Sequence, residues 1–200
     1  MNIIKSTGTF SFYTLISRVL GYLRDILIAI FLGSGALADA FFVAFRIPNT
    51  FRRLFGEGSF NAAFIPSYSK ELIKGKTNAR NFANNIFNLL TIFLLILIAI
   101  VELFMPLFVS IIAPGFKSNP EKFLLAVQLT KITFPFILFV SLASFFSAIL
   151  NSYNKFAAAS AAPIILNIFL ILILLFGKIL DEKLVIYLSY GVSLAGLTQL

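Results

Sequence analysis

Apolar residues fall into long blocks along the chain, and short polar segments separate these blocks. The blocks cover residues 9–32, 38–55, 85–112, 123–150, 159–176 and 184–200, and a short apolar continuation extends the second block to about residue 68. A membrane-spanning helix needs roughly 20 mostly apolar residues to cross about 30 Å of hydrocarbon. We therefore expect an all-α fold, a polytopic transmembrane bundle of about six helices.

The composition supports lipid as the solvent for most of the chain. Of the 200 residues, 60% are hydrophobic and 12% are charged, whereas soluble domains are about half apolar and about a quarter charged. We find no soluble domain and no long internal repeat, so residues 1–200 are expected to form a single membrane domain. Because the sequence stops at Leu200 within apolar residues, we expect this domain to be cut within or just after its sixth helix.

The polar connections predict the orientation of the helices. One group of connections is clearly basic: it contains Lys70, Lys74, Lys76 and Arg80 against Glu71, and the link at Lys155. The connections on the other side are balanced, with Lys117, Lys122, Lys178 and Lys183 against Glu121, Asp181 and Glu182. Because basic loops stay on the cytoplasmic side, we expect the N-terminus on the cytoplasmic side of the membrane.

The charge and the missing residue types exclude several functions. The net charge is +8, yet the basic residues stand at the ends of apolar blocks or singly inside them, so we expect no nucleic-acid partner. The chain has no cysteine and no histidine, which removes thiol chemistry, imidazole acid–base chemistry and the usual zinc ligands. No phosphate-binding glycine loop is present either. We therefore expect neither a cofactor nor an enzyme.

The first apolar block carries charged residues in its middle. At 100° per residue, Ser17 and Arg24 lie nearly in line, and Arg18 and Asp25 lie together on the neighbouring edge. Both arginines fall within about 5 Å of the block's midpoint, where an arginine costs about 2.5–3.5 kcal/mol on insertion scales. Three interpretations stay open: Asp25 or Asp39 neutralises them as a structural brace, they line a water-filled cavity for an anionic substrate, or the helix sits at another depth in the membrane.

The second block repeats this pattern around a bend that Pro48 is expected to cause. Charged side chains share or border one face if the helix is continuous: Asp39, Arg46, Arg53 and Glu57 on the face, with Asn49 and Arg52 beside it. Arg53 and Glu57 stand four residues apart and predict a pair at the helix end or gate. Contact with lipid headgroups is favoured for Arg46, and it competes equally with a cavity role for Arg52 and Arg53.

Weaker signals lie in the later blocks. Glu102 and Lys131 stand inside apolar sequence, where each either lies near a helix end or pairs with the other. Asn167 either faces a cavity or makes an interhelical hydrogen bond. Pro135 and Pro163 predict kinks.

Several long motifs carry a family resemblance. They are residues 17–25 (SRVLGYLRD), 39–49 (DAFFVAFRIPN), 52–58 (RRLFGEG), 113–116 (APGF) and 131–135 (KITFP). Through these motifs essentially the whole chain resembles the MurJ/MviN family of lipid II flippases. The resemblance implies the amino-terminal lobe of a two-lobed, MATE-like transporter of about fourteen helices, whose C-terminal lobe would be a partner missing here.

The resemblance also implies a substrate and a site. Family members move lipid II, the lipid-linked peptidoglycan precursor, to the outer leaflet through a central cavity. The residues that it implies as substrate-binding are Arg18, Arg24, Arg52, Asp25, Asp39, Ser17, Asn49 and Asn167. Arginine forks bind phosphate oxygens in pairs, so Arg24 and Arg52, assisted by Arg18, are expected to clamp the pyrophosphate. The two aspartates would hold the arginines when substrate is absent.

Other functions stay open beside this one. A related exporter could move another polyprenyl-pyrophosphate-linked saccharide, a multidrug exporter would favour acidic cavity residues, and a membrane scaffold would use the arginines only as braces. The sequence leaves the energy source undecided between membrane potential and an ion gradient.

Overall fold

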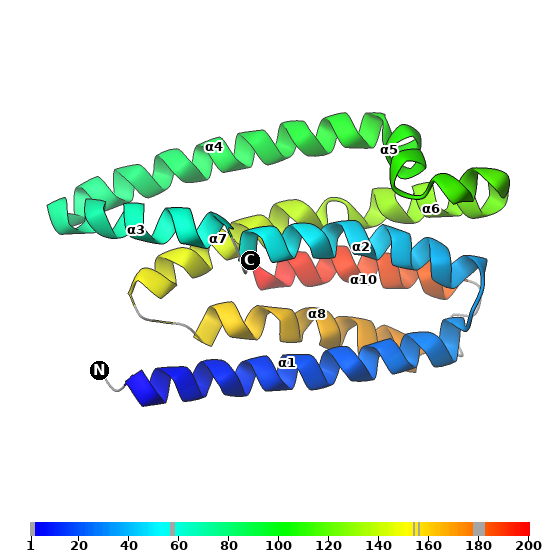
Figure 1. Cartoon of the computed structure of the whole chain (residues 1–200), viewed down its shortest axis with the longest axis horizontal. Helices are drawn as coiled ribbons and strands as arrows, with labels where there is room; N and C mark the ends of the chain where they lie inside the picture. Colours follow the sequence, from blue (N-terminus) through cyan, green and yellow to red (C-terminus); the bar gives the residue numbers. More distant parts are fainter. Residues whose placement is uncertain (1–2, 57–58, 154, 156, 178–182) are drawn as a thin grey trace.

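The computed structural model is an elongated bundle of helices that run along one long axis (Figure 1). It describes residues 3–56, 59–153, 155, 157–177 and 183–200. The described helices are α1 (Ile3–Leu32), α2 (Ala36–Gly56), α3 (Ser59–Lys74), α4 (Lys76–Leu103), α5 (Met105–Ile112), η1 (Pro114–Ser118), α6 (Pro120–Thr133), α7 (Phe136–Ser152), α8 (Ala157–Leu175) and α10 (Leu184–Gln199).

The described helices group into six passes along the long axis, as the apolar blocks predict. Helices α1, α8 and α10 are single passes, α2 and α3 lie along one pass, α6 continues into α7, and α5 turns away from the end of α4. The break between α4 and α5 comes at Phe104, just before Pro106, and the break between α6 and α7 comes at Phe134 and Pro135. Proline lacks the N–H that would continue the helical ladder, so the third and fourth passes are each divided where a proline interrupts the apolar sequence.

Reversals between passes use the conformational freedom of glycine. Gly33, after α1, has φ 63°, and Gly75, between α3 and α4, has φ 138°. Both angles lie in the region that side chains with a Cβ rarely adopt. The reversal at Gly75 gathers the basic residues of 70–80 at the end of the bundle where α1 begins, and the link at Lys155 lies at the same end (Figure 1). The bundle thus has one markedly basic end.

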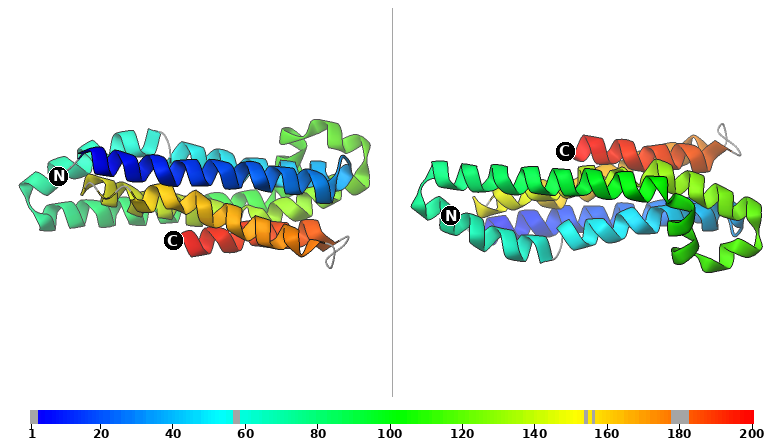
Figure 2. Two further views of the ribbon diagram at one scale, coloured as in Figure 1. Left: turned by 90° about the horizontal axis from the view of Figure 1, so that it is seen from below. Right: turned by 90° about the horizontal axis from the view of Figure 1, so that it is seen from above.

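The core lies where α2, α6, α7 and α10 pack together. Phe41, Phe134, Phe136 and Phe145 are among its largest fully buried side chains. Close approach of α10 depends on small residues, since a Cβ added at Gly196 would come within 2.6 Å of the Phe136 ring. Helix α1 stands at the side of this core and packs mainly on α8 (Figure 2).

Two helical stretches are long and apolar enough to cross a membrane within the described residues: Lys76–Leu103 and Pro120–Ser152. They differ in burial: 6% of the most apolar part of the first stretch is buried, whereas 61% of the most apolar part of the second is buried. Helix α4 therefore presents an apolar outer face, which includes Leu89, Ile92, Phe93 and Ile96. Such a large exposed apolar face is typical of a helix that contacts lipid or a partner.

Candidate functional site

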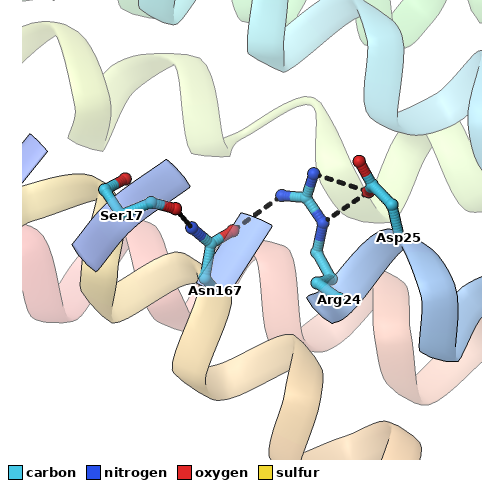
Figure 3. Close-up of polar contacts among 4 residues, drawn as sticks. All are labelled: Ser17, Arg24, Asp25 and Asn167. Atoms are coloured by element: carbon cyan, nitrogen blue, oxygen red, sulfur yellow. Dashed lines mark hydrogen bonds and ion pairs between the residues drawn. The ribbon is translucent and has the colours of Figure 1, made fainter. Parts of the chain in front are cut away.

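Arg24 of α1 is the centre of a polar cluster inside the bundle (Figure 3). Its Nε and Nη2 atoms both donate to Asp25 Oδ1, at 3.0 and 2.8 Å, and its Nη1 atom donates to Asn167 Oδ1 at 2.8 Å. The Arg24 side chain is 14% exposed and that of Asp25 is 61% exposed. The cation is therefore largely enclosed, whereas its counter-ion is open to exchange.

Asn167 of α8 joins this cluster to the backbone of α1. While its Oδ1 accepts from Arg24, its Nδ2 donates to the carbonyl oxygen of Ser17 at 3.0 Å. Asn167 is only 4% exposed, and it packs against α1 beside Gly21, which lies between Ser17 and Arg24. Of the two roles that the sequence leaves open for Asn167, an interhelical hydrogen bond is the one observed, and the same side chain also holds the guanidinium.

An aromatic ring from α2 completes the surroundings of Arg24. The guanidinium carbon lies 5.2 Å from the centroid of the Phe45 ring, within the range of a cation–π contact. Phe45 itself stacks on Phe41, with ring centroids 5.8 Å apart and planes 5° apart. Arg24 thus contacts side chains from α2 and α8 at once. Phe45 was not predicted from the sequence, because a phenylalanine among 25 carries no local signal.

Arg18 differs from Arg24 although both were predicted for the same site. Its side chain is exposed, and it forms no ion pair with any residue that the structure describes. Six residues separate it from Arg24, which is about 9 Å along a helix axis. An anion could therefore reach Arg18 without displacing a carboxylate. Arg46 and Arg53 of α2 are likewise exposed.

Within the described residues, Asp39 pairs with a lysine rather than with one of the arginines expected for it. Its Oδ2 pairs instead with Lys122 Nζ, from the first turn of α6, and that ammonium lies 4.3 Å from the centroid of the Phe116 ring. The pair lies at the end of the bundle opposite the basic connections. Sequence reasoning missed Lys122 as a partner because 83 residues separate it from Asp39.

Some predicted residues cannot be placed in the cluster. Asn49 is half-buried on α2, one residue after Pro48. The side chain of Arg52 and the whole of Glu57 lie outside the described residues, so the second arginine of the clamp and the pair of Arg53 with Glu57 stay predictions.

Glu102 and Lys131, which the sequence allows to pair, form no ion pair in the described part of the chain. Glu102 Oε1 is buried without a hydrogen-bond partner, and Lys131 is exposed.

Comparison with known proteins gives this arrangement a context. A family model described as "Lipid II flippase MurJ" matches residues 28–200. The chain belongs to the MurJ family. The structure also resembles a solved protein, "Lipid II flippase MurJ, inward closed conformation", with a TM-score of 0.77 and 29% identity, over 95% of this chain and 40% of the other. The resemblance stated from the sequence motifs is therefore confirmed.

Relatives named "Probable lipid II flippase MurJ" match the whole chain. The protein from Rickettsia prowazekii (strain Madrid E) is 40% identical over 200 residues, and the match covers 100% of this chain and 39% of the relative. The protein from Rhizobium meliloti (strain 1021) is 43% identical over 205 residues, and the match covers 38% of it. The chain spans about two fifths of the length of these MurJ relatives. Membership of this family identifies a helical membrane protein.

Proposed function

We propose that the chain forms the arginine-bearing part of a flippase that moves lipid II from the cytoplasmic to the periplasmic leaflet. The observation that carries this proposal is the geometry of Arg24. Its guanidinium is enclosed between α1, α2 and α8, yet its counter-ion Asp25 is 61% exposed. A buried arginine with an exchangeable carboxylate suits a substrate that brings its own negative charge.

The pyrophosphate of lipid II would take the place of the Asp25 carboxylate. Arg24 has five N–H donors, of which the described bonds use Nε–H and one N–H each on Nη1 and Nη2. The two unused N–H groups would be available to phosphate oxygens. After the exchange, the two N–H groups that now face Asp25 would be available as well. Asp25 would thus neutralise Arg24 while the site is empty, and its ion pair with Arg24 would break when the substrate binds.

The other predicted site residues would act around this exchange. Arg18, exposed and about 9 Å along the helix, would meet the anion before Arg24 does, and Arg52 would supply a second fork. Ser17 and Asn49 would contribute polar contacts beside the arginines. Asn167 would hold the guanidinium in orientation rather than bind the substrate alone. Asp39, paired with Lys122, would act outside the phosphate site.

The orientation follows from the positions of the basic residues. We place the end of the bundle that carries Lys70, Lys74 and Lys76 on the cytoplasmic side of the inner membrane, and with it the N-terminus. The remaining part of the MurJ protein would supply the second lobe, and rocking of the two lobes would open the cavity to each side in turn. The polyprenyl tail would stay among the membrane lipids.

Titration of lipid II onto the complete protein, followed by native mass spectrometry, tests the proposal. We expect Arg24→Ala to lose most of the lipid II adduct and Arg24→Lys to keep part of it, because lysine keeps the charge without the fork. The exposed Arg80→Ala on α4 is the control. Equal adducts in all variants would reject Arg24 as the phosphate site. Competition by another undecaprenyl-pyrophosphate-linked saccharide would show whether the site distinguishes the sugar at all.

A further inference from the structure

A proline in α2 leaves one backbone carbonyl without its helical donor. Pro48 lies inside α2 and has no N–H, so the carbonyl oxygen of Ala44, four residues earlier, loses the bond that a continuous helix would give it. Ala44 is 0% exposed. A buried carbonyl without a donor is costly, and more so where no water is present.

A hydroxyl from a neighbouring helix takes the place of the missing donor. Thr133, in the last turn of α6, donates from Oγ1 to Ala44 O at 2.8 Å, and it also lies 3.2 Å from Thr130 O on its own helix. Thr133 is 0% exposed. The shorter bond is thus the interhelical one, and it joins α6 to the point where Pro48 interrupts the ladder of α2.

A related contact lies at the break between α6 and α7, although it does not reach the carbonyl four residues before the proline. Pro135 interrupts the ladder there, and the bonds that follow span three residues rather than four: Ile137 N donates to Phe134 O at 3.0 Å. The carbonyl of Ile132, one turn before the break, accepts from the hydroxyl of Ser193 on α10. A hydroxyl from an adjacent helix therefore bonds a backbone carbonyl close to each of these two prolines.

The first of these contacts lies next to the candidate site. Ala44 immediately precedes Phe45, whose ring lies under the Arg24 guanidinium and stacks on Phe41. A shift of the backbone at Ala44 would therefore move the ring against which Arg24 is held. Thr133 is part of the motif at residues 131–135, to which the proposed function alone gives no role.

We propose that Thr133 is a positioning residue for anion binding at Arg24. It holds the carbonyl that Pro48 leaves free, and so it fixes the backbone of α2 at Phe45 and the ring under the guanidinium. This role rests on the proposed function, because it assumes that Arg24 receives the pyrophosphate. Thr133 itself does not contact the guanidinium in any described bond.

A thermodynamic cycle on the complete protein tests the hydrogen bond. We expect Thr133→Val, which keeps the shape and removes the hydroxyl, to lower Tm, and Thr133→Ser to keep it. In a Pro48→Ala background the alanine N–H can bond Ala44 O, so Thr133→Val should then change Tm little. Thr130→Val is the matched control, since the described bond of the Thr130 hydroxyl lies within α6. The drop in Tm that Thr130→Val causes should be the same in both backgrounds. An equal drop from Thr133→Val with and without Pro48 would overturn the proposal.

Lipid II affinity, measured by native mass spectrometry, tests the positioning role. We expect Thr133→Val to weaken binding about fivefold, the scale of one net hydrogen bond, and Thr133→Ser to restore it. In a Phe45→Leu background, which removes the ring, Thr133→Val should have no further effect on affinity. A fivefold loss that persists without the ring, or a failure of serine to restore binding, would overturn the role. If Arg24→Ala binds lipid II normally, the proposed function fails and the positioning role with it, while the Tm cycle still reports on the bond.

Discussion

Two cation sites in this molecule are built from the same parts and differ in where they stand. Arg24 pairs with Asp25 and lies 5.2 Å from the Phe45 ring centroid, and Lys122 pairs with Asp39 and lies 4.3 Å from the Phe116 ring centroid. Both aspartates are more than half exposed, at 61% and 53%. The parts alone therefore do not distinguish a substrate site from a structural ion pair.

Position and the remaining polar partner make the difference. Arg24 stands inside α1, about two turns before its end, and the buried amide of Asn167 holds it from α8. Lys122 stands in the first turn of α6, at an end of the bundle. An arginine enclosed at depth has no water to neutralise it, so its counter-ion can be exchanged for a substrate anion. The Lys122 side chain is 19% exposed, close to the 14% of Arg24, so its place at the end of the bundle rather than its burial distinguishes it.

The largest effect is expected where the two sites differ most, at Asn167. Replacing Asn167 by leucine removes the acceptor of Arg24 Nη1 and the donor to Ser17 O, at a side chain that is 4% exposed. We expect a loss of about 1–3 kcal/mol in the free energy of unfolding and a clear drop in lipid II affinity. Chemical denaturation measures the first and adduct titration the second. Asn81→Leu, at an exposed position of α4, is the control. An equal effect there would mean that the loss is not specific to the Arg24 site.

The two rings should also differ in effect. Phe45→Leu removes a ring that is 7% exposed, whereas Phe116→Leu removes a half-buried one. Cation–π contacts contribute about 0.5–1 kcal/mol at exposed sites and about 2 kcal/mol when desolvated. We expect Phe45→Leu to cost more stability and to weaken lipid II binding, and Phe116→Leu to leave binding unchanged. Weakened binding in both variants would contradict the separation of the two sites.

Neutralising each aspartate in turn compares the two counter-ions directly. Asp25→Asn removes the anion that competes with the substrate for Arg24, so we expect lipid II to bind up to roughly fivefold more tightly. Asp39→Asn should leave the affinity as it is. Adduct titration of the two variants side by side measures this difference. Tighter binding by Asp39→Asn alone would mean that Asp39, and not Asp25, is the counter-ion that the substrate displaces.

The smallest effect is expected at Lys122. Because Asp39 is 53% exposed, we expect Lys122→Gln to cost no more than about 1 kcal/mol of stability. Salt screens exposed pairs, so this difference should shrink when melting curves are repeated at high ionic strength. A loss that is independent of salt would mean that the pair is shielded from solvent ions.

Much of the fold could be predicted because a membrane helix is a local feature of the sequence. The apolar blocks at 9–32, 159–176 and 184–200 match α1, α8 and α10 closely. Helical periodicity also brings Ser17, Arg24 and Asp25 together, since they lie on one helix. The division of the third pass at Phe104 was not predicted, although Pro106 is a sequence signal for it, because hydropathy alone is the same on both sides of the break.

Contacts between helices could not be predicted to the same extent. The partner of Asp39, the ring under Arg24 and the donor to Ala44 O all come from helices distant in sequence. Hydropathy shows which residues avoid water, but it does not show which helices become neighbours. For this reason the sequence allowed Asn167 either to face a cavity or to bond across helices. The packing of α8 on α1 shows that it bonds across helices.

The most direct test compares the two cations in transport. The complete protein, or its Arg24→Ala or Lys122→Ala variant, would be the only lipid II flippase in growing cells, and an enzyme added outside would cleave the lipid II that reaches the outer leaflet. We predict that cleavage is lost with Arg24→Ala and continues with Lys122→Ala, at equal amounts of membrane-inserted protein. Continued cleavage with Arg24→Ala, or loss only with Lys122→Ala, would contradict the assignment of Arg24 as the site of the pyrophosphate.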